Sequence, residues 1–519
     1  MEARVAADRA PRSPAGERAL VLVGFMGAGK STAARTAAAE LGVRALDSDK
    51  ELERRLGEPI QAFFDREGED AFRAREEEVV LELLRGARGG VVALGGGAVQ
   101  SEAVREAMRS HTVVQLEVDP ADAWRRASGA GRPLARDQSR FEQLHDDRQP
   151  LYAAVADAVI PPGGRDAIRA ALPALLALAD APPGTRLVWA GAESGAYPVF
   201  FGEGLIASGF SFPREGRRFV VTDSNVARHH TVEGQEHMEV EPGEERKTLA
   251  AAEDVLRWLA RSGAERGDLV VAVGGGVVGD LAGFCAAVYQ RGMRHVQVPT
   301  TLVAQVDSAY GGKTGVDLPE GKNYAGAYHQ PAAVLCDPAA RATLDAAELA
   351  AGHAEVVKTA LIAGGSLWAR VRQGGDPDVE TVIGCARTKL AVVAEDERDA
   401  GRRQVLNLGH TVGHAIEAAT RYARYRHGEA VGIGLLAALR LSGRDALRAE
   451  VAELLGARGL PLSFGGASVD DVIALVDRDK KRAGGRVPFV LVEAPGEVTP
   501  GHEVDADRLR TAVEELHEG

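Results

Sequence analysis

The chain has 519 residues, more than a single hydrophobic core normally accommodates, so two or three domains are expected. Its 45% hydrophobic and 26% charged residues are typical of a globular protein and exclude a largely disordered chain. The formal net charge of -13 argues against a protein whose main partner is nucleic acid, so any basic site must be local.

The chain shows no sign of export or of membrane insertion. Its three cysteines, Cys285, Cys336 and Cys385, are too few and too widely spaced for a disulfide framework or a zinc knuckle, which favours a reducing, cytoplasmic location. No apolar run approaches the roughly 20 residues that span a bilayer. Residues 1–17 mix Ala and Arg with acidic residues, which predicts a disordered, solvated tail rather than a targeting peptide.

The first predicted unit alternates strands and helices. Apolar runs at 19–23, 90–94 and 112–116 read as buried strands separated by amphipathic helices, a pattern that indicates a parallel sheet covered by helices. A helix at 165–178 closes this domain, which is predicted to span 18–178. The adjacent Pro182 and Pro183 cannot continue a helix, so we place a linker at 179–185.

The second unit is predicted to have an α/β part followed by a mostly helical part. Strands are expected at 186–190, 197–201, 218–222 and 269–273, within an α/β region spanning 186–344. From Asp345 to the end at 519 the pattern is helical, with long Ala- and Leu-rich segments such as 429–441 and a late strand at 487–492. The fold class is therefore α/β in both units.

A phosphate-binding loop follows the first strand. The segment Gly24-Phe25-Met26-Gly27-Ala28-Gly29-Lys30-Ser31 satisfies G-x-x-x-x-G-K-[ST], after a strand and before a helix as that motif requires. Its glycines let backbone N–H groups converge on phosphate oxygens, while Lys30 reaches the transferred phosphate and Ser31 can ligate magnesium. A nucleotide triphosphate site is predicted.

Further motifs identify the acceptor. Asp47-Ser48-Asp49, Arg73 with Glu76, Gly95-Gly96-Gly97, Arg132-Pro133-Leu134 and Arg148 follow in order, and together with the loop they resemble shikimate kinase over about 18–178. The resemblance implies ATP binding by Gly27, Gly29, Lys30, Ser31, Thr32 and Arg132, magnesium at Ser31 and Asp47, and shikimate binding by Asp49, Arg73, Gly95, Gly96, Gly97 and Arg148. Asp49 and Arg132 would be catalytic, through the attacking hydroxyl and the transferred phosphoryl group. Taken alone, Arg73 and Glu76 at i and i+3 could be an ordinary surface pair.

A second glycine motif, Gly274-Gly275-Gly276-Val277-Val278-Gly279, matches G-x-G-x-x-G between a strand and a helix and suggests a dinucleotide. The motif gains weight because Pro299-Thr300-Thr301, Asp307 to Lys313, Gly321-Lys322-Asn323, Glu355 to Lys358 and Asn407 to His414 follow in order. This set resembles 3-dehydroquinate synthase over 185–519. The resemblance implies NAD binding by Asp223, Asn225, Glu244, Lys247, Gly275, Gly276, Asp280, Thr300, Thr301, Asp307, Lys322 and Thr343.

The histidines predict a metal site. His410 and His414 are one helical turn apart, as two zinc ligands of a protease would be, but Thr411 stands where that signature needs Glu. The resemblance instead implies Glu355, His410 and His427 as ligands of zinc or cobalt, with positions left open for substrate. His414 is then expected to contact the substrate by hydrogen bonding.

Basic residues suit a substrate that carries both phosphate and carboxylate. The resemblance implies substrate contacts from Arg291, Lys313, Asn323, Lys358, Lys389, Arg403, Asn407, His414 and one or both of Lys480 and Lys481, with Lys313, Lys358, Asn323 and His414 catalytic. An acidic protein that gathers these cations in one cleft would concentrate an anionic ligand.

The two resemblances together imply a bifunctional enzyme of aromatic amino-acid biosynthesis. It would phosphorylate shikimate with ATP and magnesium, and convert 3-deoxy-D-arabino-heptulosonate 7-phosphate to 3-dehydroquinate with NAD and a transition metal. Alternatives for the C-terminal half are another sugar-phosphate cyclase or a metal polyol dehydrogenase, and either half could instead be a degenerate binding or scaffolding module. The expected partners are small-molecule substrates and a second copy through the C-terminal half, with no nucleic acid or membrane.

Overall fold

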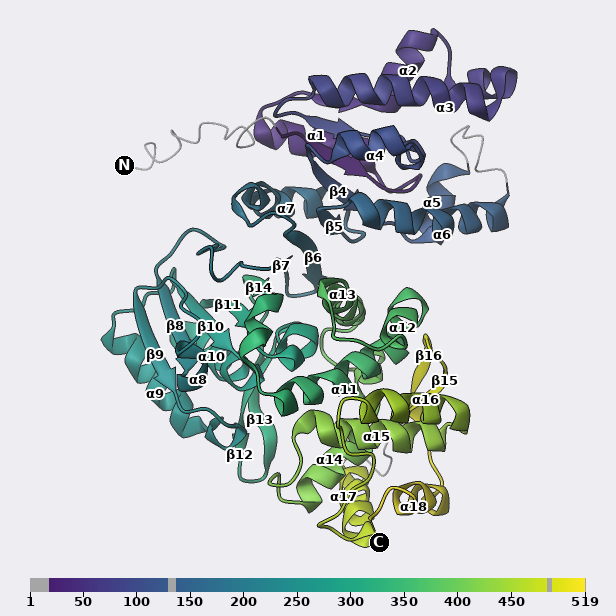
Figure 1. The fold of residues 1–519 in the computed structure, drawn as a ribbon. Helices are drawn as coiled ribbons and strands as arrows, with labels where there is room; N and C mark the ends of the chain where they lie inside the picture. Colours follow the sequence, from purple (N-terminus) through teal and green to yellow (C-terminus); the bar gives the residue numbers. More distant parts are fainter. Residues whose placement is uncertain (1–17, 129–136, 483–487, 519) are drawn as a thin grey trace. The chain divides into compact units, whose positions relative to one another are not determined.

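A computed structural model describes residues 18–128, 137–482 and 488–518, with only the backbone described at 164–165 and 479–482. The chain forms two compact units (Figure 1). The first extends to Ala190 and also includes Pro198–Phe200, while the second comprises Gly191–Tyr197 and the residues from Phe201 onward. In the described parts of the chain, no helix is long and apolar enough to cross a membrane.

The first unit is built on a sheet of parallel strands in the order β2-β3-β1-β4-β5-β6. The central strands are short and mostly apolar because both of their faces are covered, and their apolar side chains form the core together with those of the flanking helices. The strands are β1 (Leu20–Val23), β2 (Ala45–Asp47), β3 (Val91–Ala93), β4 (Thr112–Leu116), β5 (Ala158–Ile160) and β6 (Arg186–Ala192).

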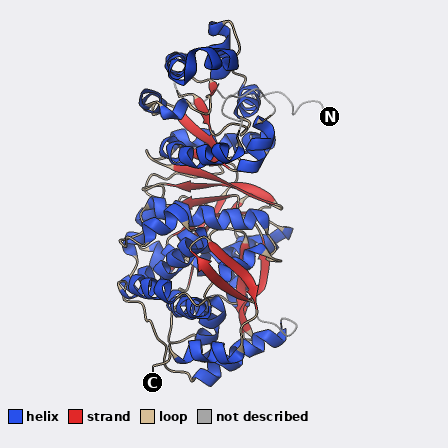
Figure 2. Cartoon of the chain, turned by 90° about the vertical axis from the view of Figure 1, so that its right-hand side faces the viewer, coloured by secondary structure: helices blue, strands red, loops and turns tan. Residues whose placement is uncertain are grey.

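Helices cover this sheet, as Figure 2 shows. They are α1 (Lys30–Leu41), α2 (Ser48–Leu56), α3 (Ile60–Gly86), α4 (Glu102–Met108), α5 (Pro120–Ala127), α6 (Gln138–Val155) and α7 (Gly164–Ala177). α1 and α7 pack side by side. α3 is interrupted at Gly68, whose φ of 86° lies in the left-handed region that glycine tolerates best.

The second unit begins with parallel strands that pair in the order β14-β11-β10-β8-β9. Its strands are β8 (Arg218–Asp223), β9 (Glu236–Val240), β10 (Leu269–Gly274), β11 (Arg294–Pro299) and β14 (Ala333–Cys336), with β7 (Gly195–Phe201) preceding them in the chain. The helices α8 (Ser224–Ala227), α9 (Leu249–Arg261) and α10 (Gly276–Val288) accompany it, and β12 (Lys313–Leu318) pairs with β13 (Gly321–Tyr328) as an antiparallel hairpin.

The rest of the second unit is mainly helical and is coloured green to yellow in Figure 1. It contains α11 (Ala346–Ala363), α12 (Gly365–Val371), α13 (Val379–Glu395), α14 (His410–Ala419), α15 (His427–Leu441), α16 (Asp445–Gly456), α17 (Val469–Arg482) and α18 (Ala506–Glu514). β15 (Phe489–Ala494) and β16 (Glu497–His502) form its hairpin. The predicted α/β class, with a largely helical C-terminal region, is confirmed.

The strand β6 belongs to the first compact unit, although the sequence pattern assigns 186–190 to the second domain. β5 and β6 pair in parallel, with Ala158 opposite Leu187 and Val159 opposite Val188. A strand directly after a Pro-Pro segment gives no local signal of which sheet it will join, because pairing partners are chosen by non-local contacts.

Candidate active sites

The phosphate loop of the first unit joins β1 to α1 and has the backbone that its glycines allow. Gly29 is the N-cap of α1 with φ 86°, a conformation that would strain any side-chain-bearing residue. The Lys30 ammonium donates to the carbonyls of Gly24 at 2.8 Å and Phe25 at 3.0 Å, so it lies across the loop where phosphates would bind. The loop is thus a preformed anion cradle at a helix N-terminus.

A cavity of about 610 Å³ opens beside this loop. Every predicted ATP, magnesium and shikimate residue that the structure describes lines it, namely Gly27, Gly29, Lys30, Ser31, Thr32, Asp47, Asp49, Arg73, Gly95, Gly96, Gly97 and Arg148. Arg132 lies outside the described residues. Residues separated by more than a hundred positions therefore converge on one cavity, of a size that holds small ligands.

A cluster of charged side chains lines the cavity beside the glycine triplet. Arg73 forms an ion pair with the buried Glu76 at 2.6 Å, which rules out the surface-pair alternative. Burial raises the pKa of Glu76, and nearby Asp49 adds to that rise while Arg73 opposes it. A Cβ on Gly95 would lie 2.6 Å from an Asp49 oxygen and 2.7 Å from a Glu76 oxygen, so only glycine fits between these carboxylates.

Arg148 lines the same cavity, beside Gly96. Its guanidinium is buried, donates to the Gly96 carbonyl at 3.3 Å, and keeps a buried Nε without a hydrogen-bond partner. Such a group is suited to a bound anion, because an unpaired buried donor is costly. The Tyr152 hydroxyl donates to the same carbonyl at 2.6 Å and so fixes the Gly96 peptide.

Sequence reasoning missed Arg126. This residue on α5 lines the cavity and donates to the Gly27 carbonyl at 3.0 Å, which brings a second cation to the phosphate loop. The only sequence signal is the pair of arginines in the last turn of α5, a position also favoured by the helix dipole alone.

In the second unit, the dinucleotide motif lies between β10 and α10. Gly275 is the N-cap of α10, and a Cβ there would lie 2.8 Å from the Thr301 methyl group, so the backbone and Thr301 meet closely. Thr300 is buried, and its hydroxyl oxygen has no hydrogen-bond partner. At the end of β8, the Asp223 side chain caps α8 by accepting from Asn225 and Val226.

Charged NAD candidates form a buried network around Lys247. This lysine forms ion pairs with Glu244 at 2.9 Å, Asp280 at 3.2 Å and Asp317 at 3.8 Å, although it is only 3% exposed. Burial would lower the pKa of Lys247, but the three carboxylates raise it on balance. Burial raises the pKa of Asp280 to about 6 against the effect of Lys247.

The remaining NAD candidates have partners of their own. Lys322 pairs with Glu417 at 3.1 Å, and the Thr343 hydroxyl lies 3.3 Å from His230 Nε2. Asp307 is paired with Lys389 at 2.8 Å. Asp307, an NAD candidate, is therefore in direct contact with Lys389, a substrate candidate.

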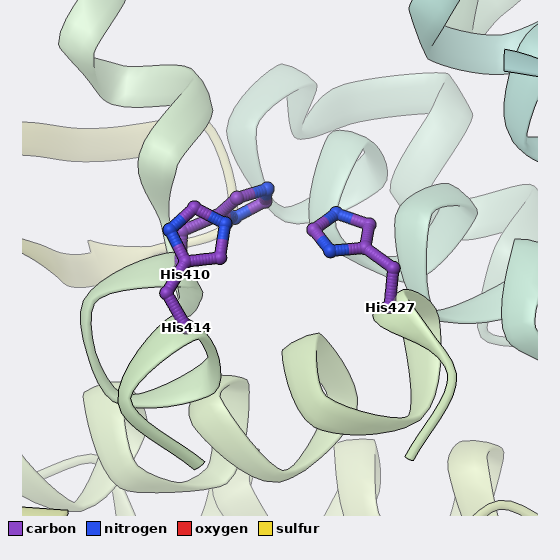
Figure 3. Close-up of side chains that lie close together, drawn as sticks. All are labelled: His410, His414 and His427. Carbon is purple, nitrogen blue, oxygen red and sulfur yellow. The ribbon is translucent and has the colours of Figure 1, made fainter. Parts of the chain in front are cut away.

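Three imidazoles gather where the metal is predicted (Figure 3). One nitrogen from each of His410, His414 and His427 lies within 4.8 Å of the others. Glu355 Oε1 lies 3.8 Å from His410 Nε2 and 3.5 Å from His427 Nε2. The Glu355 carboxylate is fully buried, and its Oε1, which faces the two imidazole nitrogens, accepts no hydrogen bond, while Oε2 is ion-paired with Lys358. A buried carboxylate oxygen without a donor, facing imidazole nitrogens, fits a transition-metal ion.

The electrostatics of this cluster favour a cation. Burial alone would lower the pKa of His427, but the Glu355 and Glu417 carboxylates raise it to about 9. Burial and the Lys358 charge hold the pKa of His410 well below its usual value. Lys358 and Glu355 form a buried ion pair at 2.5 Å, so this lysine lies directly against the proposed ligand set.

Most of the predicted substrate cations are already paired with other groups. Lys313 contacts Asp399, and the Lys389 ammonium also donates to the Asp307 carbonyl at 2.7 Å. The buried Arg403 donates to the carbonyls of Glu397 at 2.6 Å and Gly311 at 3.1 Å. Asn323 has a left-handed φ of 57° and donates its backbone N–H to Asp317 at 2.8 Å.

The remaining substrate candidates lie on other segments. Arg291 ends the 3-10 turn that follows the C-terminal end of α10, whereas the glycine motif lies at the N-terminal end of that helix. Asn407 ends a 3-10 turn three residues before His410. Lys480 and Lys481 lie in α17, but their side chains are outside the described residues.

Comparisons with known proteins match this division of the chain. The sequence models described as "3-dehydroquinate synthase N-terminal" and "3-dehydroquinate synthase C-terminal" match residues 237–351 and 352–482. A 3-dehydroquinate synthase from Caulobacter vibrioides (strain NA1000 / CB15N) is 41% identical over 366 residues, covering 64% of this chain and 98% of that protein. The chain belongs to the 3-dehydroquinate synthase family. We call the second unit the synthase unit.

The first unit matches a different family. The model described as "Shikimate kinase" matches residues 26–175, and we call this the kinase unit. A solved shikimate kinase from Acinetobacter baumannii, in complex with shikimate, is 35% identical and covers 31% of this chain and 94% of that chain, at a TM-score of 0.30.

A solved structure similar to the synthase unit is 2-epi-5-epi-valiolone synthase from Streptomyces hygroscopicus subsp. jinggangensis 5008, with NAD+ and Zn2+ bound. It is 25% identical and covers 63% of this chain and 98% of that chain, with a TM-score of 0.56. The family matches confirm both resemblances drawn from the motifs.

Proposed function

We propose that this chain is a bifunctional enzyme of aromatic amino-acid biosynthesis. The kinase unit phosphorylates shikimate with ATP, and the synthase unit converts 3-deoxy-D-arabino-heptulosonate 7-phosphate to 3-dehydroquinate and phosphate. The observation that carries this proposal is that each unit matches its family while its candidate residues cluster, around the phosphate loop in one case and around Glu355 and the histidines in the other.

In the kinase unit, positioning and charge supply the catalysis. Lys30 and the loop N–H groups hold the ATP phosphates, with Arg126 as a further cation, and Ser31 and Asp47 would hold magnesium, which would neutralise charge on the phosphates. Arg148 and Arg73 bind the shikimate carboxylate, with Arg73 held in place by Glu76. Asp49 then orients the attacking hydroxyl and accepts its proton. Arg132 is assigned to the transferring phosphoryl group by sequence alone.

In the synthase unit, Glu355, His410 and His427 would hold zinc or cobalt, and the NAD candidates would hold the dinucleotide against it. When bound, the metal polarises substrate oxygens and NAD takes up and later returns a hydride, so the reaction has no net redox change. This chain's own residues orient the substrate. Lys358 and His414 lie at its metal-bound end, while Lys389, Arg403 and Asn407 are proposed for its carboxylate and Lys313 and Asn323 for its phosphate.

Existing ion pairs of the predicted lysines bear on how an anionic substrate would bind. Lys313, Lys358 and Lys389 each face a carboxylate in the ligand-free protein, so substrate oxygens exchange for existing partners rather than meeting isolated cations. Prior pairing holds these lysines in place, which lowers the reorganisation needed during the reaction.

Other sugar-phosphate cyclases and polyol dehydrogenases are weaker alternatives for the synthase unit. Identity to 3-dehydroquinate synthases reaches 41% over almost their whole length, against 25% for the valiolone synthase. The set Lys389, Arg403 and Asn407 also suits a carboxylate-bearing substrate better than a neutral sugar phosphate.

We also propose that the enzyme is cytoplasmic and forms a homodimer through its C-terminal half. Its three cysteines are free and buried, as suits a reducing compartment. The homodimer is carried over from the resemblance to 3-dehydroquinate synthase.

Two assays on the purified full-length chain test the proposal. Phosphate release from 3-deoxy-D-arabino-heptulosonate 7-phosphate should depend on NAD and a transition metal, and ADP formation should depend on shikimate and magnesium. Activity in only one assay would refute bifunctionality, and turnover of a neutral sugar phosphate in place of the keto acid would favour the other cyclases.

A further inference from the structure

The buried residue Glu417 lies between two parts of the synthase unit. It is on α14, in the helical part, and is 1% exposed. One carboxylate oxygen, Oε2, lies 3.4 Å from His427 Nδ1, while the other, Oε1, lies 3.1 Å from the Lys322 ammonium. The carboxylate therefore contacts a proposed metal ligand on one side and a proposed dinucleotide residue on the other.

The His427 ring has a different carboxylate at each nitrogen. Its Nδ1 faces Glu417 and its Nε2 faces Glu355 Oε1 at 3.5 Å. A histidine that donates Nδ1–H to a carboxylate has its Nε2 lone pair free for a metal and its ring held in one orientation. Glu417 has the place that this arrangement requires.

Lys322 is itself held in a defined position against Glu417. Its ammonium lies 4.8 Å from the centre of the Tyr422 ring and 3.9 Å from Glu244. Tyr422 reaches it because the chain after α14 turns through two left-handed residues, Arg421 at φ 57° and Tyr422 at φ 55°. The Tyr422 N–H donates back to the Glu417 carbonyl at 2.7 Å. Such backbone conformations persist only where the surroundings require them.

Helix geometry explains how one short helix supplies three of these groups. His410, His414 and Glu417 are at positions i, i+4 and i+7, so they share one face of α14. His427 comes from the first residue of α15, which packs against α14. Glu417 thus contacts the Nδ1 side of the His427 ring, while the rings of His410 and His414 lie beside that of His427.

We propose that Glu417 is a positioning residue for the metal site: it orients His427 through Nδ1, and Lys322 holds the Glu417 carboxylate in place from the dinucleotide side. This inference rests on the metal site of the proposed function. Glu417 contacts neither substrate nor cofactor in this role and acts only through its neighbours.

The test is the cobalt affinity of the metal-free, full-length protein, measured by the visible absorption of bound Co2+ and by competition with a chelator. Glu417→Gln keeps the shape but removes the charge, and it should weaken Co2+ binding by about 10- to 100-fold, the usual range for a group that supports a metal ligand. Glu450→Gln is the matched control, because Glu450 forms an ion pair with Arg372 on a different helix. It should leave Co2+ affinity unchanged.

Two more variants separate the possible failures. Glu355→Ala should abolish Co2+ binding, and wild-type affinity in that variant would mean that the metal site itself is wrongly assigned. Lys322→Met leaves Glu417 beside His427 but less firmly held, so it should weaken Co2+ binding by an amount between wild type and Glu417→Gln. If Glu417→Gln binds Co2+ like wild type, Glu417 is only half of a structural ion pair and the inference is wrong. If Lys322→Met binds Co2+ like wild type, the holding role of Lys322 is wrong. Should Glu417→Gln not fold, Glu417→Asp replaces it as the deciding variant. It retains the charge but withdraws it from Nδ1, so Co2+ binding should again be weaker than in wild type.

Discussion

The two active sites are built on different physical principles. In the kinase unit, backbone groups of glycine-rich segments and cations at the wall of an open cavity face the ligand space directly. In the synthase unit, the candidate side chains are mostly buried and paired with one another, as Lys247 is with three carboxylates and Lys358 with Glu355. Substitutions in the kinase cavity should therefore change activity more than stability, whereas those in the synthase network should change both.

The largest expected effect is loss of one activity without the other. Lys30→Ala removes the cation at the phosphate loop and should lower shikimate phosphorylation by at least about 10²- to 10³-fold, with 3-dehydroquinate formation near wild type. His410→Ala and Lys313→Ala should do the reverse. Assaying both reactions in each variant makes each the control for the other, and loss of both activities in any one variant would contradict separate sites.

The two units should also differ in metal dependence, because only the synthase reaction is expected to need a transition metal. A strong chelator with magnesium in excess should abolish 3-dehydroquinate formation and leave the kinase active, because the imidazole nitrogens around Glu355 prefer zinc or cobalt to magnesium. Added Zn2+ or Co2+ should restore activity. Full synthase activity in protein shown by elemental analysis to lack transition metals would refute the ligand assignment.

The buried network should show itself in stability. Lys247→Met leaves three partly buried carboxylates without the cation that they share, and should lower the free energy of unfolding of the synthase unit by about 3 kcal/mol. The same change at the exposed Lys50 of the kinase unit should alter stability by less than about 0.5 kcal/mol. Calorimetry can measure this change in stability. The unfolding transition of the synthase unit is the one whose temperature rises when NAD is added.

The pH dependence of the Lys247→Met effect has a definite sign. Burial already raises the pKa of Asp280 to about 6, and losing Lys247 removes the main influence that lowers it. A carboxyl with a raised folded-state pKa stabilises the fold at low pH, and that contribution disappears as pH rises through the folded pKa. The deficit of the variant should therefore be smallest near pH 4 and grow toward neutral pH. A deficit that shrinks as pH rises would show that Asp280 is not the group left unpaired.

Sequence reasoning predicted the features that short segments and motifs determine. It missed the features that depend on contacts between residues far apart in the sequence. The strands β1, β4 and β10, the phosphate loop and the helical change near Asp345 follow from short apolar runs and glycines. Arg126 and Glu417 were missed because their roles come from contacts with Gly27 and Lys322, each more than ninety residues away. Glu417 did carry a usable signal, the i, i+4, i+7 spacing from His410.

The placement of β6 gives a smaller effect. Because β6 pairs with β5 and contributes the buried Leu187 and Val188, a kinase fragment ending at Ala181 should be less stable than one ending at Ala190 by about 2–4 kcal/mol. Urea denaturation of the two fragments gives this difference. Equal midpoints would restore the boundary at the Pro182-Pro183 linker that the sequence suggests.

The smallest expected effect is communication between the two reactions, which we expect to be negligible. The synthase product must still be dehydrated and reduced before it becomes shikimate, so no intermediate passes directly from one site to the other. Energetic coupling would need a two-state element that ligands of both units bias. The ion pairs described around each site join residues of the same unit, which offers no such element. In the intact chain, kcat/KM of the kinase should therefore be the same with and without NAD, metal and the seven-carbon substrate, and kcat/KM of the synthase should not respond to ATP and shikimate. A change beyond about fivefold in either value, roughly 1 kcal/mol of coupling, would show that the units communicate.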